Sequence, residues 1–242
     1  MKIIAVIPAR YNASRFPGKL MQDLGGKTVI ATTYENVVKT QLFSEVFVAT
    51  DSEIIFDEIK NIGGNVVMTS NHETGSDRIA EAVKNIDCDI VVNVQGDEPF
   101  LKTEPLQQLI SVFYNDSSKE ISLASLKIKL IDIEDVINPN HVKVITDLQN
   151  FAMYFSRAVI PFHRDQELIA DYYKHIGVYA FRKEALLKFA SLEMSPLEKL
   201  EKIECIRYLE NGMKIKMIET NFVGVGIDVP EDLEKARAIL NQ

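Results

Sequence analysis

The sequence predicts an α/β protein with three layers (α/β/α) and a mostly parallel sheet. Short runs rich in Val and Ile alternate with longer runs whose apolar residues recur three and four positions apart. This alternation repeats through the first half of the chain, and strand-helix-strand order favours a parallel sheet covered on both faces. The 242 residues are enough for one domain with a large core.

The elements of the first half follow from these two periods. Strands are expected at 2–7, 45–50, 65–69 and 89–95, because these runs are short, apolar and β-branched. Helices are expected at 28–42, 51–63 and 76–86. Gly63 and Gly64 indicate that the second helix ends there before the chain enters the next strand.

The second half is less regular. Strands are expected at 121–130, 141–147, 214–220 and 222–229. The run 175–189 reads as a strand leading into a helix, and 195–212 as one helix with Pro near its start and Gly after its end. A last helix is expected at 230–240. We therefore expect a single domain over 1–242, with a smaller β-rich insertion at roughly 130–190.

Composition narrows the classes of function. The net charge is −8 and the isoelectric point is near 5.1, which excludes a general binder of nucleic acid or anionic membranes. The first apolar run stops at Pro8, too early for a signal sequence, and no run approaches the roughly 18 apolar residues of a membrane span. Cys88 and Cys205 have neither a secreted framework nor a zinc spacing. A cytoplasmic location is the expectation.

The loop after the first strand reverses the sign of the charge. It carries Arg10, Arg15 and Lys19 on a segment with a Pro-Gly turn, and the first acid is Asp23. Ligands of open α/β sheets bind beyond the carboxyl ends of the strands, where this loop lies. Three cations without local acids favour a phosphate site over a solvated turn.

Two acidic segments also follow apolar strands. Asp97 and Glu98 end the run at 89–95, and Asp228 follows a glycine-bearing run. Carboxylates at such positions suit Mg2+, which takes one or two of them together with substrate phosphates. The alternatives are a solvated turn for Asp97 and a helix cap for Asp228. Beside the cationic loop, the two acids together predict a metal-triphosphate site.

Other candidates are less specific. Ser76 is a plausible N-cap of its helix, and Ser76 and Arg78 could instead line a nucleotide pocket. His175 lies in an apolar strand, where a core role is the commoner one, and Glu204 could lie on a solvated helix face. The P-loop GxxxxGK[ST] and the dinucleotide fingerprint GxGxxG are both missing from the sequence.

A family resemblance extends over essentially the whole chain. The segments IPARYNASRFPGK, TGSDR, VNVQGDEP, NPNHVKV, YFSRAVIP, KHIGVYAF, SPLEKLE and GVGIDVPEDLE occur in this order. The chain resembles the 3-deoxy-manno-octulosonate (Kdo) cytidylyltransferases, the CMP-Kdo synthetases of Gram-negative bacteria. The resemblance implies a nucleotide-diphospho-sugar transferase fold, a homodimer, and the reaction of CTP with Kdo to give CMP-Kdo and diphosphate for lipopolysaccharide.

The resemblance also implies roles for particular residues. Arg10 and Lys19 match triphosphate ligands, with Arg15 in the same loop, and Asp97 and Asp228 match magnesium ligands. Catalysis is therefore expected from these charged side chains. Positions used around the nucleotide and the sugar acid match a further set: Ser76, Arg78, Gln95, Arg157, His175, Tyr179 and Glu204.

The chain departs from the family pattern at two positions. Leu20 follows Lys19 where a proline is common, and Val229 stands in the threonine place of the last motif. The first should alter the stiffness of the loop, and the second the cap of the last helix. Neither change removes a charge that the chemistry needs.

Three other functions compete with this one. A sister enzyme acting on 8-amino-Kdo or a related sugar acid would share the carboxylate-binding arginine. A metal-dependent glycosyltransferase usually has D-x-D after a strand, whereas this chain has D-E-P. A non-catalytic nucleotide-binding regulator would not need the second aspartate.

Overall fold

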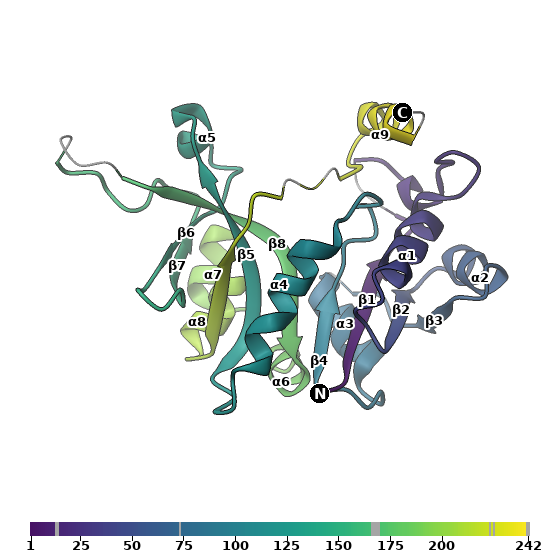
Figure 1. The fold of residues 1–242 in the computed structure, drawn as a ribbon, viewed down its shortest axis with the longest axis horizontal. Helices are drawn as coiled ribbons and strands as arrows, with labels where there is room; N and C mark the ends of the chain where they lie inside the picture. The colour runs from purple at the N-terminus through teal and green to yellow at the C-terminus, as the bar shows by residue number, and fades with distance from the viewer. Residues whose placement is uncertain (13–14, 73, 166–169, 223, 225, 241–242) are drawn as a thin grey trace. The chain divides into compact units, whose positions relative to one another are not determined.

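A computed structural model describes residues 1–12, 15–72, 74–165, 170–222, 224 and 226–240 (Figure 1). The chain divides into two compact units. The first unit is Met1–Thr103 with Val223–Gln242, and the second unit is Glu104–Phe222. The single domain with an insertion at roughly 130–190 stays a prediction.

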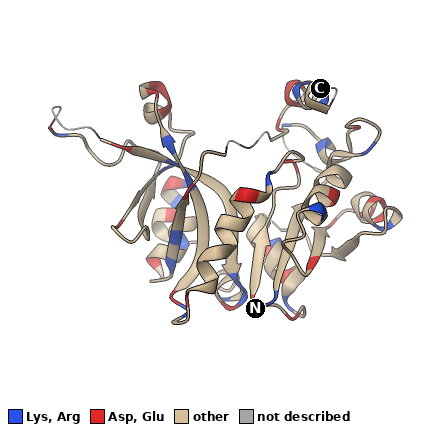
Figure 2. Ribbon diagram, viewed as in Figure 1, with Lys and Arg blue, Asp and Glu red and all other residues tan. Residues whose placement is uncertain are grey.

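The first unit has a parallel sheet in the order β3-β2-β1-β4. Its strands are β1 (Ile3–Ala9), β2 (Glu45–Thr50), β3 (Asn65–Met68) and β4 (Ile90–Asn93). Strand β1 is buried on both faces, since Ile4 and Val6 on one face and Ala5 and Ile7 on the other have no exposed surface. In Figure 2 the strands β1 and β4 are tan along their whole length, because they contain no Lys, Arg, Asp or Glu.

The helices of the first unit are α1 (Val29–Lys39), α2 (Glu53–Asn61), α3 (Gly75–Val83) and α9 (Pro230–Leu240), with a short 3-10 turn η1 (Lys19–Met21). Right-handed crossovers carry the chain outward from β1 to β3 through α1 and α2, and back to β4 through α3. Because the connections run outward along the sheet from β1 to β3 and then back to β4, the helices lie on both faces of the sheet (Figure 1). The predicted strands and helices of the first half are confirmed.

The second unit is built around the long strands β5 (Ile121–Leu130) and β8 (Tyr172–Arg182), which pair antiparallel. Strand β9 (Lys214–Glu219) lies parallel to β5. The hairpin of β6 (Lys143–Thr146) and β7 (Ala152–Ser156) joins β8 through β6. The helices are α4 (Thr103–Tyr114), α5 (Ile133–Ile137), α6 (Lys183–Ala190), α7 (Pro196–Glu201) and α8 (Cys205–Glu210).

The structure corrects the prediction in three places. The helix expected at 195–212 is two helices, because Lys202 takes a left-handed conformation with φ 54° and ends α7. The described residues of the strand expected at 222–229 are not in a strand, and residues 223 and 225 lie outside the described part. Helix α4 was not predicted, although Leu106, Leu109, Ile110 and Phe113 have helical spacing and are buried.

No helix in the described part of the chain is both long and apolar enough to cross a membrane.

Candidate active site

A cavity of about 480 Å3 opens at the carboxyl ends of the strands of the first unit. Five of the predicted charged residues line it: Arg10, Arg15, Lys19, Asp97 and Asp228. Arg78 and Gln95 line it as well. The sequence-based prediction therefore brought together residues that are more than 200 positions apart.

The loop after β1 is closed by a backbone hydrogen bond. The Gly18 N–H donates to the Tyr11 carbonyl at 2.9 Å, and Gly18 is left-handed with φ 70°. A Cβ at this position would lie 3.3 Å from the Tyr11 hydroxyl, so glycine suits both the conformation and the space. The turn delivers Lys19 to the cavity on η1, with Leu20 buried behind it.

The ammonium group of Lys19 lies between two carboxylates. It donates to Asp97 Oδ2 in a short contact and to Asp228 Oδ1 at 3.1 Å. The second carboxylate oxygen of Asp228 pairs with Arg15 Nη2 at 3.1 Å. The Lys19 side chain is 13% exposed, which shields this contact from solvent more than an ordinary surface ion pair.

Backbone contacts hold the two aspartates together. The Ile227 N–H donates to the Asp97 carbonyl at 2.9 Å, which joins the segment before α9 to the segment after β4. Asp232, in the first turn of α9, accepts at Oδ2 from the N–H groups of Asp228 and Val229, the two residues before the helix. The Asp228 carboxylate itself pairs with the cations Lys19 and Arg15.

The residues fit a divalent metal ion. The carboxylates of Asp97 and Asp228 already meet at one cationic centre, the Lys19 ammonium, so both can reach a shared ion. Among the described residues there is no cluster of three or more His, Cys, Asp or Glu side chains suited to a metal. Two carboxylates completed by phosphate oxygens are the arrangement that Mg2+ commonly uses with nucleotides.

Glu98, the residue after Asp97, is an acidic neighbour of this site, but it is not among the residues that line the cavity. Burial, reinforced by the charges of Asp97 and Asp228, raises the pKa of Glu98 to about 7. Gly224 leaves room for its carboxylate, since a Cβ there would lie 3.2 Å from Glu98 Oε2. The QGDEP motif places Glu98 at the end of a strand, but the sequence does not reveal that its carboxylate is buried.

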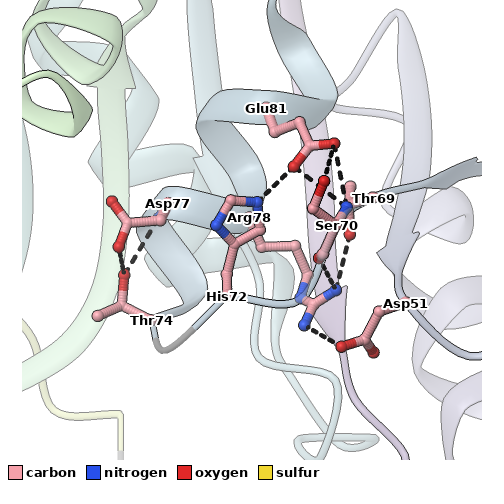
Figure 3. Close-up of polar contacts among 8 residues, drawn as sticks. All are labelled: Asp51, Thr69, Ser70, His72, Thr74, Asp77, Arg78 and Glu81. Carbon is pink, nitrogen blue, oxygen red and sulfur yellow. Dashed lines mark hydrogen bonds and ion pairs between the residues drawn. The ribbon is translucent and has the colours of Figure 1, made fainter.

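The TGSDR segment differs in detail from the prediction. Thr74, rather than Ser76, is the N-cap of α3, because its hydroxyl accepts from the Asp77 N–H at 3.1 Å. Ser76 is buried inside the helix and is not among the residues that line the cavity. The Arg78 guanidinium is also buried and bonds Asp51 at 2.9 Å and Thr69 at 2.7 Å (Figure 3).

The four remaining predicted residues lie in the second unit. Arg157 donates to the carbonyls of Glu201, Pro139 and Lys202. Three of its five N–H groups are thereby used, and the other two make no hydrogen bond to a described residue.

Of the other three, His175 and Tyr179 lie on the strand β8, and Glu204 directly precedes α8. His175 Nε2 lies 2.9 Å from the Ser125 hydroxyl, and burial lowers the pKa of His175 to about 4. Burial likewise raises the pKa of Tyr179, whose hydroxyl contacts Cys205. One carboxylate oxygen of Glu204 is buried. None of these three shows a catalytic pairing among the described residues.

Comparison with known proteins agrees over the whole chain. A family profile described as Cytidylyltransferase matches residues 4–215. The chain is 61% identical to the 3-deoxy-manno-octulosonate cytidylyltransferase of Flavobacterium johnsoniae, over 99% of both chains. It is 62% identical to the protein of that name from Christiangramia forsetii, over 99% of this chain and 97% of the relative.

Solved structures are similar as well. A CMP:2-keto-3-deoxy-manno-octonic acid synthetase complexed with CTP is 36% identical, with a TM-score of 0.93 over 100% of this chain and 99% of its own. The 4-diphosphocytidyl-2C-methyl-D-erythritol synthase of Anaerococcus prevotii is 19% identical, with a TM-score of 0.66 over 100% of this chain and 99% of its own. The second likeness supports the fold alone. The predicted three-layer, mostly parallel fold is confirmed.

Proposed function

Because this chain belongs to the cytidylyltransferase family, we propose that it activates Kdo: CTP and Kdo give CMP-Kdo and diphosphate. The observation that carries the proposal is the convergence of Lys19, Asp97 and Asp228 in one cavity, beside Arg10 and Arg15. Cations and carboxylates so close together suit a triphosphate with a divalent metal.

The reaction is an in-line displacement at phosphorus. A hydroxyl oxygen of the sugar acid forms a bond to the α-phosphorus, the bond from that phosphorus to the β-phosphate oxygen breaks, and the hydroxyl proton is lost. Diphosphate leaves with additional negative charge. No covalent link to the protein is required, so the chain's task is to position the reactants and stabilise charge.

The cationic loop stabilises the leaving group. Arg10, Arg15 and Lys19 approach the cavity from one loop, and a guanidinium fork or an ammonium group suits phosphate oxygens. Lys19 exchanges its aspartate partners for phosphate oxygens when the nucleotide binds. The charge that builds on diphosphate then meets a preorganised positive group.

Asp97 and Asp228 would hold Mg2+. Bound there, the ion supplies charge neutralisation at the α-phosphate and lowers the pKa of the attacking hydroxyl. The 2.9 Å hydrogen bond from the Ile227 N–H to the Asp97 carbonyl joins the two segments that carry these aspartates. For the sugar, we propose that the free N–H groups of Arg157 receive the carboxylate of Kdo.

The relatives support Kdo over 8-amino-Kdo, since their names specify 3-deoxy-manno-octulosonate. We also propose that the product supplies lipopolysaccharide synthesis and that the enzyme acts in the cytoplasm. The cytoplasmic location is supported by Cys88 and Cys205, neither of which is in a disulfide.

The test is an assay of released diphosphate with CTP, Mg2+ and Kdo, with the sugar product identified by mass spectrometry. The matched reactions replace CTP by UTP, ATP or GTP, and Kdo by 8-amino-Kdo. The proposal predicts CMP-Kdo as the main product. Faster turnover of 8-amino-Kdo, or no diphosphate with CTP and Kdo, would reject it.

A further inference from the structure

Lys143 is a buried lysine of the second unit that the proposed function has not used. It lies on β6 and has no exposed surface. Its Nζ atom donates to the Asn138 carbonyl at 3.0 Å and to the Arg157 carbonyl at 2.6 Å. Lysine is rarely buried in proteins unless a partner compensates it, and here both hydrogen-bond partners among the described residues are backbone carbonyls.

The Arg157 guanidinium, which comes directly after β7, is held by carbonyls as well. Its Nε, Nη1 and Nη2 atoms donate to the carbonyls of Glu201, Pro139 and Lys202 at 2.7, 3.0 and 3.4 Å. Of the two N–H groups without a described partner, one is on Nη1 and the other is on Nη2. A pair of N–H groups on the two terminal nitrogens suits a carboxylate ligand.

The charge of this guanidinium is not used inside the described part of the unit. Arg207, by contrast, forms an ion pair with Glu198 at 2.7 Å. The Glu201 carboxylate contacts the backbone next to the guanidinium instead: Oε1 accepts the Ser156 hydroxyl at 2.6 Å and Oε2 accepts the Arg157 N–H at 2.9 Å. The guanidinium therefore keeps its charge for an anionic ligand.

Lys143 and Arg157 hold the same two segments of chain. Lys143 bonds the carbonyl of Asn138, and Arg157 bonds the carbonyl of the next residue, Pro139. Lys143 also bonds the carbonyl of Arg157 and lies opposite Ser156 in the pairing of β6 with β7. Burial, followed by the charge of Arg157, lowers the pKa of Lys143, which agrees with two cationic side chains close together.

On the basis of the proposed function, we propose that Lys143 is a positioning residue that holds Arg157 where its guanidinium receives the carboxylate of the sugar acid. Two parallel hydrogen bonds to a carboxylate require a guanidinium whose plane is set, and a fixed side chain loses less freedom on binding. Without the Lys143 donor, the buried carbonyls of Asn138 and Arg157 lose a partner. The loss should therefore affect the sugar acid rather than CTP.

The experiment measures the KM for Kdo and the KM for CTP in wild type, Lys143→Met, Arg157→Met and the double variant. Methionine is unbranched and fills the space of the lysine stem, but it has no N–H group. Lys127→Met is the matched control, since Lys127 is 4% exposed and its Nζ atom bonds Thr146 at 3.1 Å and Asn150 at 3.0 Å. The control removes a second buried, twice-bonded lysine from the same unit.

We expect Lys143→Met to raise the KM for Kdo at least about tenfold and to keep the KM for CTP within about twofold of wild type. Lys127→Met should keep both values within about twofold of wild type. Because Lys143 acts through Arg157, adding Lys143→Met to Arg157→Met should change the KM for Kdo less than about twofold. A full effect of Lys143→Met in that background, an unchanged KM for Kdo in the single variant, or equal effects of the two lysine variants would overturn the proposal.

Failure of the proposed function is distinguishable from failure of this inference. If the wild type forms no CMP-sugar, the reaction is wrong, and calorimetry with Kdo and with its carboxamide, in the presence of a non-hydrolysable CTP analogue, tests Lys143 without turnover. The inference predicts that wild type prefers the carboxylate and that Lys143→Met loses this preference. Equal binding of the two compounds by wild type would reject it.

Circular dichroism identifies a variant that fails to fold. If Lys143→Met does not fold, Glu201→Gln decides by the same comparison of KM values. Its amide replaces one of the two oxygens that accept the Ser156 hydroxyl and the Arg157 N–H. A higher KM for Kdo with an unchanged KM for CTP supports the positioning of Arg157, and equal changes in both values reject it.

Discussion

At the scale of single residues, the site depends on one ammonium group shared by two carboxylates. Lys19 contacts both Asp97 and Asp228, and Arg15 takes the remaining oxygen of Asp228. Each group is balanced by opposite charge before a substrate enters, which reduces the cost of keeping charges in a partly buried cavity. When a nucleotide binds with its metal, phosphate oxygens can replace the aspartates as partners of the cations, and the metal can replace the cations as partner of the aspartates.

Replacing Asp97 or Asp228 by Asn should lower kcat at least about 100-fold, equivalent to about 2.7 kcal/mol, because a metal ligand becomes neutral. Steady-state kinetics at saturating CTP measure this. Glu234→Gln is the control, since Glu234 is 70% exposed and its ion pair among the described residues is with Arg237. A near-normal rate for either aspartate variant removes that residue from the metal site.

His175 makes a different residue-scale prediction, about stability. Its pKa is about 4 in the folded protein and 6.5 when unperturbed, because burial disfavours the charged ring. The unfolded chain therefore binds more protons between these values, and stability falls as the pH drops from 6.5 towards 4, by at most about 3 kcal/mol. Above pH 6.5 His175 contributes no slope.

Urea unfolding at a series of pH values checks the His175 prediction. The difference between wild type and His175→Phe isolates the histidine from the acids that also titrate in this range. The difference should grow steadily below pH 6.5. A difference that is constant from pH 4 to 8 would show that His175 is charged equally in both states.

The sequence predicts only some of the residues that lie together in the site. The strand-end rule places Arg10, Lys19 and Asp97 at one edge of the sheet. It also selected Asp228, although the described residues of the strand expected before Asp228 are not in a strand. The rule cannot reveal that His72 is held by Glu81, since that contact depends on the path of the loop before α3. Cap preference also predicted the wrong residue, Ser76, because Thr74 and Ser76 are both good N-caps and lie two residues apart.

At the scale of elements, a buried ion pair determines how α7 and α8 meet. Glu198 of α7 receives two hydrogen bonds at 2.7 Å from the Arg207 guanidinium of α8, and both side chains are at most 6% exposed. Glu198 also accepts the Ser195 N–H in a capping box. These contacts require the chain to reverse between the helices, which it does at Lys202.

Glu198→Gln should destabilise the protein by about 3 to 5 kcal/mol, because it leaves the Arg207 charge buried without its partner. Denaturant unfolding measures the change. The control is Glu120→Gln, whose partner Lys214 is 52% exposed, and it should cost less than about 1 kcal/mol. Equal effects of the two substitutions would contradict the role given to the buried pair.

The break at Lys202 explains why one long helix was predicted. The run 195–212 has helical spacing throughout, and it has no Gly or Pro between Pro196 near its start and Gly212 at its end. Local propensity therefore favours continuation, whereas the pairing of Glu198 with Arg207 rewards a turn. A tertiary contact of this kind cannot be read from periodicity. The strands of the first unit were predictable because burial on both faces leaves an unbroken apolar run.

At the scale of the whole molecule, the most exposed large apolar side chains among the described residues belong to the second unit. Ile131 and Phe162 are 90% and 85% exposed, and Leu148 is fully exposed. Exposed apolar side chains are often covered in protein-protein contacts. For this reason, and because the family resemblance implies it, we propose that the protein is a homodimer.

Light scattering during size-exclusion chromatography should therefore give about twice the 27.4 kDa of the chain. Leu148→Asp combined with Phe162→Asp should shift the protein to the monomer, because a charge buried at the contact is costly. Lys27→Asp, in the first unit, is the control and should stay dimeric. A wild-type protein that elutes as a monomer at micromolar concentration would refute the dimer.

The most direct measurement of the central claim is a crystal structure with Mn2+ and a non-hydrolysable CTP analogue. The account predicts an anomalous peak bound by a carboxylate oxygen of Asp97 and one of Asp228, at roughly 2.0 to 2.2 Å. It also predicts Lys19 in contact with a phosphate oxygen. A manganese ion held by other residues, or a triphosphate that contacts neither Arg10 nor Lys19, would contradict it.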